Sequence, residues 1–384
     1  MFEVLIRFFV LGLFSFGGPA AHIGFFQREF VEKRKWLSDN DFTQAVALCQ
    51  FLPGPASSQL GMYIGFKRAG YLGAASAFAG FTLPSFALLT FLAVASADAI
   101  NANAMNIFIQ AAKLLAVIVV ADAVWGMAKK NVVSAATITA ALLTGVWVTF
   151  STGLLGQIVP ILIAALVGLI ISYKKGEPAN NESAVTPKIV PHKGLLASFF
   201  ILLIGLPTIS AFSTELGLFN IFYQAGSFVF GGGHVVLPLL QPVLEGMVQS
   251  DDFLAAYASA QLVPGPMFTM ASYLGAIVMP QSPIVGSLVA TIAVFLPGAL
   301  LLFAFLPTWK AIFAHAKLKA AITLVNASVV GLLASAFISP VISSAIITWQ
   351  DVVAVAVGYV LLKYKNVPVW LLAILLGGYT IIIH

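Results

Sequence analysis

The stretch from Phe42 to Phe66 reads FTQAVALCQFLPGPASSQLGMYIGF, and its centre is Leu52-Pro53-Gly54-Pro55. The stretch is apolar enough to lie in a membrane. However, two prolines without a backbone N–H, and the glycine between them, interrupt any helix at its middle. Each arm has about twelve residues, roughly half of the about 20 that a membrane span needs. The sequence therefore predicts a broken helix with its tip near mid-membrane, where transporters commonly build a binding site.

A second copy of this pattern lies in the other half of the chain. Pro264-Gly265-Pro266 is the centre of the apolar stretch from Phe253 to Met279. Further motifs repeat in the same order in the two halves: Asp41-Phe42 as Asp252-Phe253, Gln50 as Gln261, Phe16-Gly17-Gly18 as Phe230-Gly231-Gly232, and Leu83-Pro84 as Leu296-Pro297. Repetition of several spaced motifs in one order indicates an internal duplication.

The composition is typical of an integral membrane protein. Of the 384 residues, 60% are hydrophobic and only 9% are charged, and the mean hydropathy is +1.01. A soluble domain cannot cover that much apolar surface, so the net charge of +5 reflects the loops and does not indicate nucleic-acid binding. The single cysteine, Cys49, excludes an internal disulfide and a thiolate metal cluster. No cleavable signal peptide is evident, because Glu3 and Arg7 interrupt the first apolar run.

Basic residues indicate that the two halves are inserted in opposite directions. The loop after the first Gly-Gly motif contains Arg28 and Lys33-Arg34-Lys35, whereas its counterpart, residues 241–252, contains no Lys or Arg. Lys67-Arg68 follows the first Pro-Gly-Pro segment, and the uncharged Pro280-Gln281-Ser282 follows the second. Because cytoplasmic loops are enriched in Lys and Arg, we expect equivalent loops of the two halves to face opposite sides.

These patterns predict an all-α integral membrane protein with two inverted-topology repeats and a cytoplasmic N-terminus. We expect two re-entrant helical hairpins in each repeat, followed by about four transmembrane helices. The expected parts are residues 1–173 as the first repeat, 174–194 as a cytoplasmic connector, 195–214 as a linking transmembrane helix, and 215–384 as the second repeat.

The first repeat's expected hairpins are residues 2–26 and 42–66. With them, every Lys and Arg except Arg7 and Lys113 lies in or beside a cytoplasmic loop. The alternative is a kinked full span for 42–66, which would leave Lys67-Arg68 outside.

The repeated motifs also carry a family resemblance. Phe16-Gly17-Gly18-Pro19 with His22, Leu52-Pro53-Gly54-Pro55, and their second-half copies resemble the chromate ion transporter family in its long, two-repeat form. The resemblance covers nearly the whole chain. It implies an inner-membrane protein of bacteria or archaea that moves chromate, typically outward, with sulfate as competitor or counter-substrate. The second half has Gly233-His234 in place of Pro19-Ala20, and Phe268-Thr269 in place of Ser57-Ser58, so we do not expect a symmetric site.

A divalent oxyanion inside a membrane needs hydrogen-bond donors, and helix breaks supply them. A helix that restarts at Pro55 leaves its first N–H groups, from about Ala56 to Ser58, without helical partners at the positive end of its dipole. We therefore expect a substrate site where such tips converge, with these candidates: Gly17, Gly18, Gly54, Ser57, Ser58, Gly232, Gly233, Gly265 and Thr269. The alternative is that the glycines and prolines only permit tight helix packing.

His22, His234, Gln50 and Gln261 are further substrate-binding candidates. Each histidine lies close to a Gly-Gly motif and can donate to an oxyanion or carry a coupling proton near neutral pH. Each glutamine lies three residues before a Pro-Gly-Pro motif. The alternative for all four is a hydrogen bond to backbone groups that the breaks leave unpaired. A zinc site is not expected, because no carboxylate or thiolate lies at ligand spacing nearby.

Asp122 is a carboxylate inside a predicted span, which makes it a candidate for proton coupling. The alternative is an aspartate that reaches the cytoplasmic side or forms an ion pair within the bundle. Lys113 lies on the opposite face of the same predicted helix, so the two side chains should not pair with each other. Lys67-Arg68 and Arg28 form either an electrostatic funnel at the cytoplasmic mouth or a determinant of topology.

Together these inferences predict a secondary transporter, not an enzyme, that exports chromate by alternating access without a cofactor or metal. Its expected partners are a small inorganic oxyanion and the lipid bilayer, with no nucleic acid, and a homodimer is compatible with the sequence. Ion gradients would supply the energy, because no Gly-x4-Gly-Lys-Ser/Thr motif occurs. A sulfate-type uptake carrier and an anion channel remain alternatives. An intramembrane hydrolase is disfavoured, because no Ser-His or paired-Asp arrangement is evident.

Overall fold

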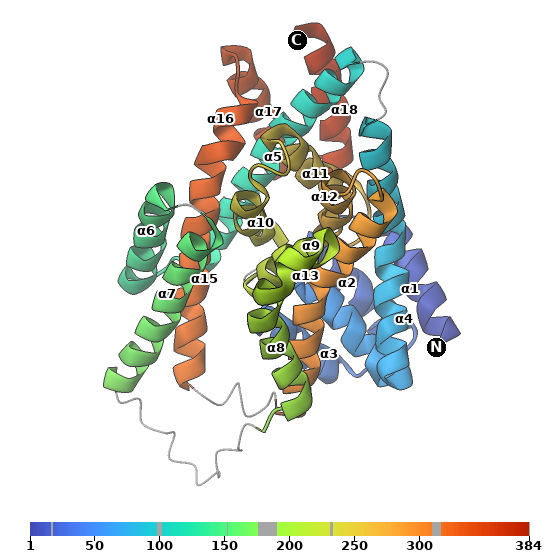
Figure 1. The fold of residues 1–384 in the computed structure, drawn as a ribbon, viewed down its shortest axis with the longest axis vertical. Coiled ribbons are helices and arrows are strands. Elements are labelled where there is room, and N and C mark those ends of the chain that lie inside the picture. The colour runs from blue at the N-terminus through green and yellow to red at the C-terminus, as the bar shows by residue number, and fades with distance from the viewer. Residues whose placement is uncertain are drawn as a thin grey trace.

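The structure is a computed structural model that describes residues 1–16, 18–97, 102–151, 153–175, 190–230, 233–308 and 316–383. In these ranges the regular elements are all helices (Figure 1). The first half contains α1 (Phe2–Phe14), α2 (Gly18–Phe26), the π-helical η1 (Gln27–Lys33), α3 (Asp39–Phe51), α4 (Ala56–Ala97), α5 (Ala102–Asn131), α6 (Ala135–Phe150) and α7 (Gly153–Lys175).

The linking segment and the second half are also helical. They contain α8 (Lys193–Ile209), η2 (Ser210–Phe212), α9 (Thr214–Ser227), η3 (Gly233–Val235), α10 (Val236–Leu244), α11 (Ser250–Leu262), η4 (Met267–Thr269), α12 (Met270–Val278), α13 (Pro283–Phe305), η5 (Leu306–Thr308), α15 (Ala316–Ala336), η6 (Phe337–Ile342), α16 (Ser343–Ala345), α17 (Trp349–Lys365) and α18 (Val369–Ile383).

The first two apolar segments fold back on themselves. Glu3, at the start of α1, contacts Arg34 after η1 at 3.4 Å and Arg68 of α4 at 3.2 Å. Arg68 ends the first part of α4, because Ala69 and Gly70 have non-helical backbone angles. The beginning of the first segment and the ends of both therefore lie together. This geometry supports two hairpins, and their depth in a membrane stays a prediction.

Equivalent contacts recur in the two halves, as a duplication requires. Gly12 of α1 packs on α4, where an added Cβ would lie 3.1 Å from the Pro84 side chain. Gly226 of α9 packs on α13, where an added Cβ would lie 3.1 Å from the Pro297 side chain. Because both prolines belong to the repeated Leu-Pro motif, the helix pair α1–α4 corresponds to the pair α9–α13.

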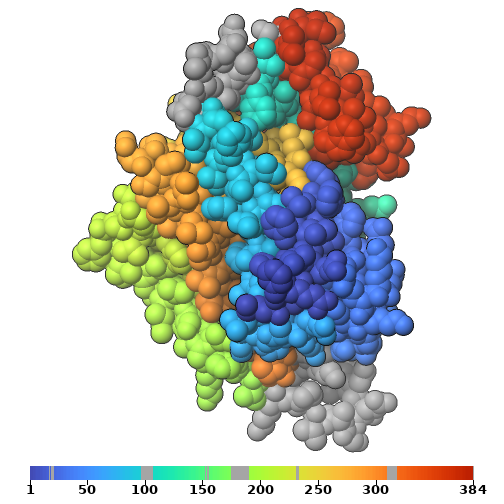
Figure 2. Space-filling model, turned by 90° about the vertical axis from the view of Figure 1, so that its right-hand side faces the viewer, coloured from blue at the N-terminus to red at the C-terminus, as the bar shows by residue number. Residues whose placement is uncertain are grey.

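The hairpins of the two halves differ in burial. Residues 253–260 of α11 and 236–240 of α10 are all buried, and these helices lie in the middle of the molecule (Figure 1). By contrast, α1 buries only Val4, Phe8 and Gly12. It lies on the outer surface beside α4 (Figure 2). The hairpin helices α10 and α11 of the second repeat therefore lie in the core, together with the buried residues 110–120 of α5. The other first-repeat helices flank this core, with α1 and α4 on one side and α6 and α7 on the other (Figure 1).

Six helices are long and apolar enough to cross a membrane among the described residues: Ala56–Ser96, Ile107–Asn131, Leu155–Tyr173, Lys193–Phe212, Pro283–Thr308 and Leu318–Ala345. The expected spans at α6, α17 and α18 are shorter, at 16, 17 and 15 residues. A helix of about 16 residues rises about 24 Å, less than the about 30 Å hydrocarbon core. Such helices can cross only where the bilayer thins or flanking residues extend to its surface.

Candidate functional site

The first Pro-Gly-Pro break separates α3 from α4 and contacts the second repeat. Gly54 has a φ of +116°, a backbone conformation that favours glycine, and its N–H donates to the Val229 carbonyl at 2.8 Å. A Cβ on Gly54 would lie 2.8 Å from the Gly298 Cα. We call Gly54, Gln59, Val229 and Gly298 the Gly54 junction.

The second Pro-Gly-Pro break makes the same contacts with the first repeat. Gly265 has a φ of +112°, and its N–H donates to the Ser15 carbonyl at 3.0 Å. A Cβ on Gly265 would lie 2.8 Å from Ser85 Oγ. Within the repeated motifs Ser15 corresponds to Val229 and Ser85 corresponds to Gly298. We call Ser15, His22, Ser85 and Gly265 the Gly265 junction.

A third contact connects the two junctions. Gly233, directly after the second Gly-Gly motif, packs against Met267 and Phe268, which follow the second Pro-Gly-Pro motif. Gly54 therefore contacts Val229, Gly233 four residues later contacts Met267 and Phe268, and Gly265 contacts Ser15. The structure brings all four helix breaks together. Gly17 and Gly232 lie outside the described residues.

The restart of α4 supplies the donors that the sequence predicts. The first helical hydrogen bond at this end is from Gln59 N–H to the Pro55 carbonyl, at 2.9 Å, so the N–H groups of Ala56, Ser57 and Ser58 precede the helical ladder. Ser57 and Ser58 are buried, at 3% and 2% exposure. Among the described residues, Ser58 Oγ has no hydrogen-bond partner. A buried hydroxyl beside a helix N-terminus is a suitable donor for an anion.

Gln59 lies at the Gly54 junction and was not among the residues predicted from the sequence. Its Nε2 donates to the Pro53 carbonyl at 3.0 Å and to the Gly298 carbonyl at 2.9 Å, so one amide connects the first break to α13. The Oε1 atom is buried and has no partner in the described part of the chain. Gln59 could have been predicted from the sequence, because it is a polar residue one turn after Pro55 in an apolar segment. Gln50 was predicted as the binding residue instead, but it is exposed near the end of α3.

His22 lies at the Gly265 junction. Its ring is fully buried, with Nε2 3.2 Å from the Ser15 carbonyl oxygen that also accepts the Gly265 N–H. The ring is perpendicular to Phe81 of α4, with 5.1 Å between the centroids. Within the described ranges Nδ1 has no hydrogen-bond partner. Gly18, with a φ of +73°, starts the helix that carries His22.

Each of the polar side chains predicted for the second half has a partner elsewhere in that half. Thr269 Oγ1 donates to the Pro266 carbonyl at 2.5 Å, within the short 3-10 turn η4. His234 Nδ1 lies 2.6 Å from the Tyr257 hydroxyl, and the Gln261 amide contacts the Met267 sulfur. These side chains already have partners. Among the described residues, most buried polar atoms without a partner at the breaks lie in the first half, and Ser259 Oγ near the end of α11 is the exception.

Asp122 makes none of the contacts that define the two junctions, although it is close enough for its charge to act on His234. Its Oδ1 is 2.6 Å from Lys363 Nζ of α17, and both side chains are more than a third exposed. Lys113 pairs instead with Asp251 at 2.7 Å, so the two α5 charges have separate partners as predicted. This ion pair gives Asp122 a structural role, and proton coupling by Asp122 stays a prediction. No group of three His, Cys, Asp or Glu side chains in the described chain could hold a metal ion.

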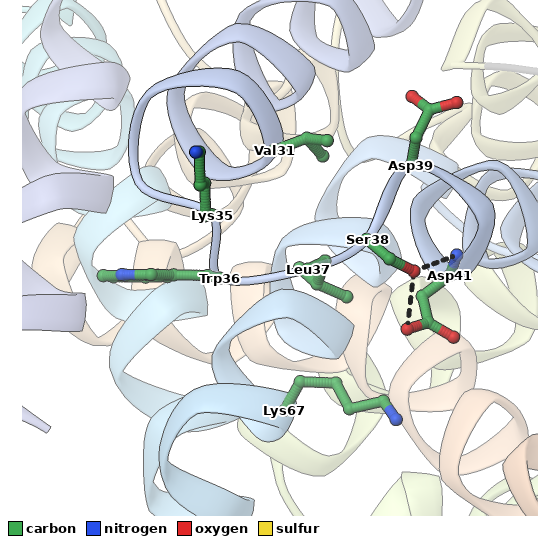
Figure 3. Close-up of a pocket in the computed structure, with 8 residues that line it drawn as sticks. All are labelled: Val31, Lys35, Trp36, Leu37, Ser38, Asp39, Asp41 and Lys67. Atoms are coloured by element: carbon green, nitrogen blue, oxygen red, sulfur yellow. Dashed lines mark hydrogen bonds between the residues drawn. The ribbon is translucent and has the colours of Figure 1, made fainter.

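A cavity of about 550 Å³ opens at the ends of the first two hairpins (Figure 3). Lys35 and Lys67 line it together with Asp39 and Asp41, and Ser38 Oγ accepts the Asp41 N–H at 3.1 Å. Arg68 is paired with Glu3 and does not provide an unbalanced positive charge. The mouth therefore carries both signs of charge, which favours the topology interpretation of these basic residues over an anion funnel.

Comparisons with known proteins agree with the duplicated architecture. A family model described as "Chromate transporter" matches residues 2–170 and again residues 216–382. A probable chromate transport protein of Synechococcus elongatus is 29% identical over 86% of this chain and 82% of its own length. The chromate transport protein of Cupriavidus metallidurans is 28% identical over 77% of this chain and 71% of its own length.

The similarity extends to archaea. An uncharacterized transporter of Methanocaldococcus jannaschii is 24% identical over 98% of this chain and 93% of its own length. No solved structure matches the chain.

Proposed function

The chain belongs to the chromate transporter family, and from this premise we propose that it is a secondary transporter that exports chromate by alternating access. Its family and its relatives support transport of chromate across a membrane. The proposal adds the direction, the location of the site, and sulfate as a competing or counter-transported anion. Sulfate enters because the two oxyanions share a tetrahedral shape and a double negative charge.

The observation that carries the proposal is the set of buried donors at the start of α4. The N–H groups of Ala56 to Ser58 precede the first helical hydrogen bond of α4, and the Ser58 hydroxyl is buried without a partner among the described residues. A buried donor left unpaired costs about 1–3 kcal/mol, so an anion that pairs with several of them gains this free energy. The donors are neutral, which allows an anion to bind without being trapped by a fixed positive charge.

The contacts between the repeats support alternating access. The hydrogen bonds Gly54–Val229 and Gly265–Ser15 join equivalent pairs of positions in opposite repeats. The contacts at the centre are therefore related by an approximate two-fold symmetry. In inverted-repeat transporters such a centre is the fixed region around which one repeat rocks against the other. We infer that the hairpins open toward the cytoplasm in the first repeat and outward in the second, in the plasma membrane of a bacterium or archaeon.

Flux measurements in proteoliposomes test this function. Purified protein is reconstituted with chromate or sulfate inside, and efflux is followed with and without the other anion outside. We expect saturable flux that is accelerated by counter-anion, because a carrier returns faster when it is loaded. Flux that rises linearly with concentration and ignores the counter-anion would favour an anion channel. If neither anion moves, the substrate assignment is wrong.

A further inference from the structure

We propose that His22 takes up a proton when the oxyanion binds, which makes a proton the second ligand of the site. The inference rests on the proposed oxyanion transport and adds the group that links it to pH. It also rests on the packing of α2 beside the start of α4, where a Cβ on Gly61, one turn after Ser57, would lie 3.7 Å from Phe26, one turn after His22. It is carried by the hydrogen-bond geometry of a single imidazole, and it assigns His22 and His234 different roles.

The first step is the tautomer of His22. Its Nε2 lies 3.2 Å from the Ser15 carbonyl oxygen. A carbonyl oxygen only accepts hydrogen bonds, so Nε2 must carry the proton. The Gly265 N–H donates to the same oxygen at 3.0 Å, which holds that carbonyl in place across the interface between the repeats. A neutral His22 is therefore fixed with its other nitrogen, Nδ1, unprotonated.

The second step concerns what Nδ1 can do. It is buried and has no hydrogen-bond partner among the described residues. In the neutral ring Nδ1 is an acceptor, and a fully ionised oxyanion also offers only acceptors. The two repel unless one proton is added. Protonation converts Nδ1 to a donor and gives the ring a positive charge, so a bound dianion and a protonated His22 stabilise each other.

The third step is the absence of another counter-charge on the elements that pack around His22. On α1, Glu3 pairs with Arg34 and Arg68 at the open end of the hairpin, and Arg7 lies two turns before Ser15. On α4, Lys67 lies over the Tyr63 ring. The turn 263–266 has no ionisable residue. In η1, which packs on α2, Glu29 pairs with Lys33 and Arg34, and Glu32 is exposed. In the described structure, no carboxylate pairs with His22, so a bound oxyanion must supply the negative charge.

His234 provides the contrast. It follows the second Gly-Gly motif, but its Nδ1 already lies 2.6 Å from the Tyr257 hydroxyl. That hydroxyl can donate to a neutral imidazole, so His234 needs no proton from solution to satisfy Nδ1. The structure therefore assigns proton uptake to His22 and not to His234.

The test is calorimetry of sulfate binding to the purified full chain, in two buffers with different enthalpies of ionisation. Sulfate is the probe because it stays a dianion from about pH 6 to pH 8, where histidine titrates. The buffer dependence reports the protons taken up on binding. We expect uptake of close to one proton above the pKa of free His22, and an affinity that falls about tenfold for each pH unit there.

Two variants assign the proton. In His22→Gln the amide can still donate to the Ser15 carbonyl, and we expect sulfate binding with no proton uptake and no pH dependence. In a second variant the other four histidines, His192, His234, His315 and His384, are replaced by Gln, and we expect the uptake to persist. This second variant decides the assignment even if His22→Gln does not fold.

Three results would overturn the inference. Wild-type binding of sulfate without proton uptake would refute it and leave oxyanion transport intact. Uptake that persists in His22→Gln, or that is lost in the four-histidine variant, would refute the assignment to His22. Absence of binding by both sulfate and chromate would refute the proposed function, and this inference with it.

Discussion

The two Pro-Gly-Pro breaks have the same backbone and different side chains. Gly54 and Gly265 share a positive φ, a hydrogen bond to the opposite repeat, and a close approach to the Leu-Pro segment of that repeat. We compared equivalent positions of the repeated motifs. Five polar residues of the first half correspond to an apolar residue of the second half or to Thr269, whose hydroxyl already has a partner. The pairs are Ser15 and Val229, His22 and Val236, Ser57 and Phe268, Ser58 and Thr269, and Gln59 and Met270.

This comparison separates two uses of a duplication. The backbone conformation that the two breaks share forms the Gly54 and Gly265 junctions, where the repeats cross. A rocking motion of one repeat against the other requires such a contact. Within the described structure, the divergent side chains leave most of the unpartnered buried polar atoms at the breaks, Ser58 Oγ, Gln59 Oε1 and His22 Nδ1, in the first half, with Ser259 Oγ as the second-half exception. A tetrahedral anion does not need a symmetric site, so donors from the first repeat are sufficient to bind it. The more buried second repeat then provides a rigid apolar support.

The largest expected effect comes from the feature that both breaks share. Gly54→Ala and Gly265→Ala each add a Cβ at a positive φ and within 2.8 Å of the opposite repeat. Backbone strain alone costs about 1–3 kcal/mol, and the steric clash adds to it. We expect both variants to lose transport and most of their folded protein, measured by flux and by size-exclusion chromatography.

Gly24→Ala is the matched control, because a Cβ at Gly24 meets no atom within 4 Å. It should keep wild-type yield and flux. Normal flux in either Gly54→Ala or Gly265→Ala would show that the contact between the repeats does not depend on close backbone approach. It would contradict a common structural role for the two glycines.

The next effect should be confined to the first break. The double change Ser57→Ala with Ser58→Ala removes two hydroxyls at the start of α4. Hydrogen bonds to a charged group contribute about 1.5–3 kcal/mol each, so we expect the loss of both to lower oxyanion affinity about a hundredfold or more with little change in stability. Sulfate calorimetry measures this loss.

Ser272→Ala of α12 is the second-half control, because its hydroxyl already donates to the Thr269 carbonyl at 2.8 Å. It should bind sulfate normally. Equal losses of affinity in the two variants would contradict a one-sided site, and no loss in either would return Ser57 and Ser58 to a packing role.

A smaller effect is expected when a first-half residue is replaced by the residue at the equivalent second-half position. Gln59→Met installs the second-half residue and leaves the Pro53 and Gly298 carbonyls without their amide donor. Loss of a buried partner costs about 1–3 kcal/mol. We expect a lower unfolding temperature in thermal denaturation, and weaker sulfate binding. An unchanged unfolding temperature would show that the amide does not hold the junction together.

The smallest effect is expected away from the junctions. Asp122→Asn removes a partly exposed ion pair with Lys363, and such pairs contribute about 0–1 kcal/mol. Transport driven by a pH gradient should therefore continue in a folded Asp122→Asn variant. Loss of that coupling, with anion counter-transport retained, would move the proton pathway from His22 to Asp122.

Sequence patterns were sufficient for the elements that depend on local chemistry. The breaks at Pro53 and Pro264, the duplication and the helical class follow from residue types and their order, and the structure and the family match confirm the duplication and the class. The restart of α4 at Ala56 was also predictable, because proline commonly precedes or starts a helix.

Partners that come from distant parts of the chain were not predictable. Gln59 meets Gly298, and Asp122 meets Lys363, only after the repeats pack together. Gln50 and Gln59 are both polar residues beside the same break, and only their opposite positions, exposed and buried, distinguish them. Which half keeps unpaired donors depends on such contacts, so the sequence predicted asymmetry without its location.

The most direct test is a structure of the protein with chromate bound, located by the anomalous X-ray scattering of chromium. The account predicts one peak at the start of α4, within hydrogen-bonding distance of the N–H groups of Ala56 to Ser58. A peak beside Met267 to Thr269, or in the cavity lined by Lys35 and Lys67, would contradict it.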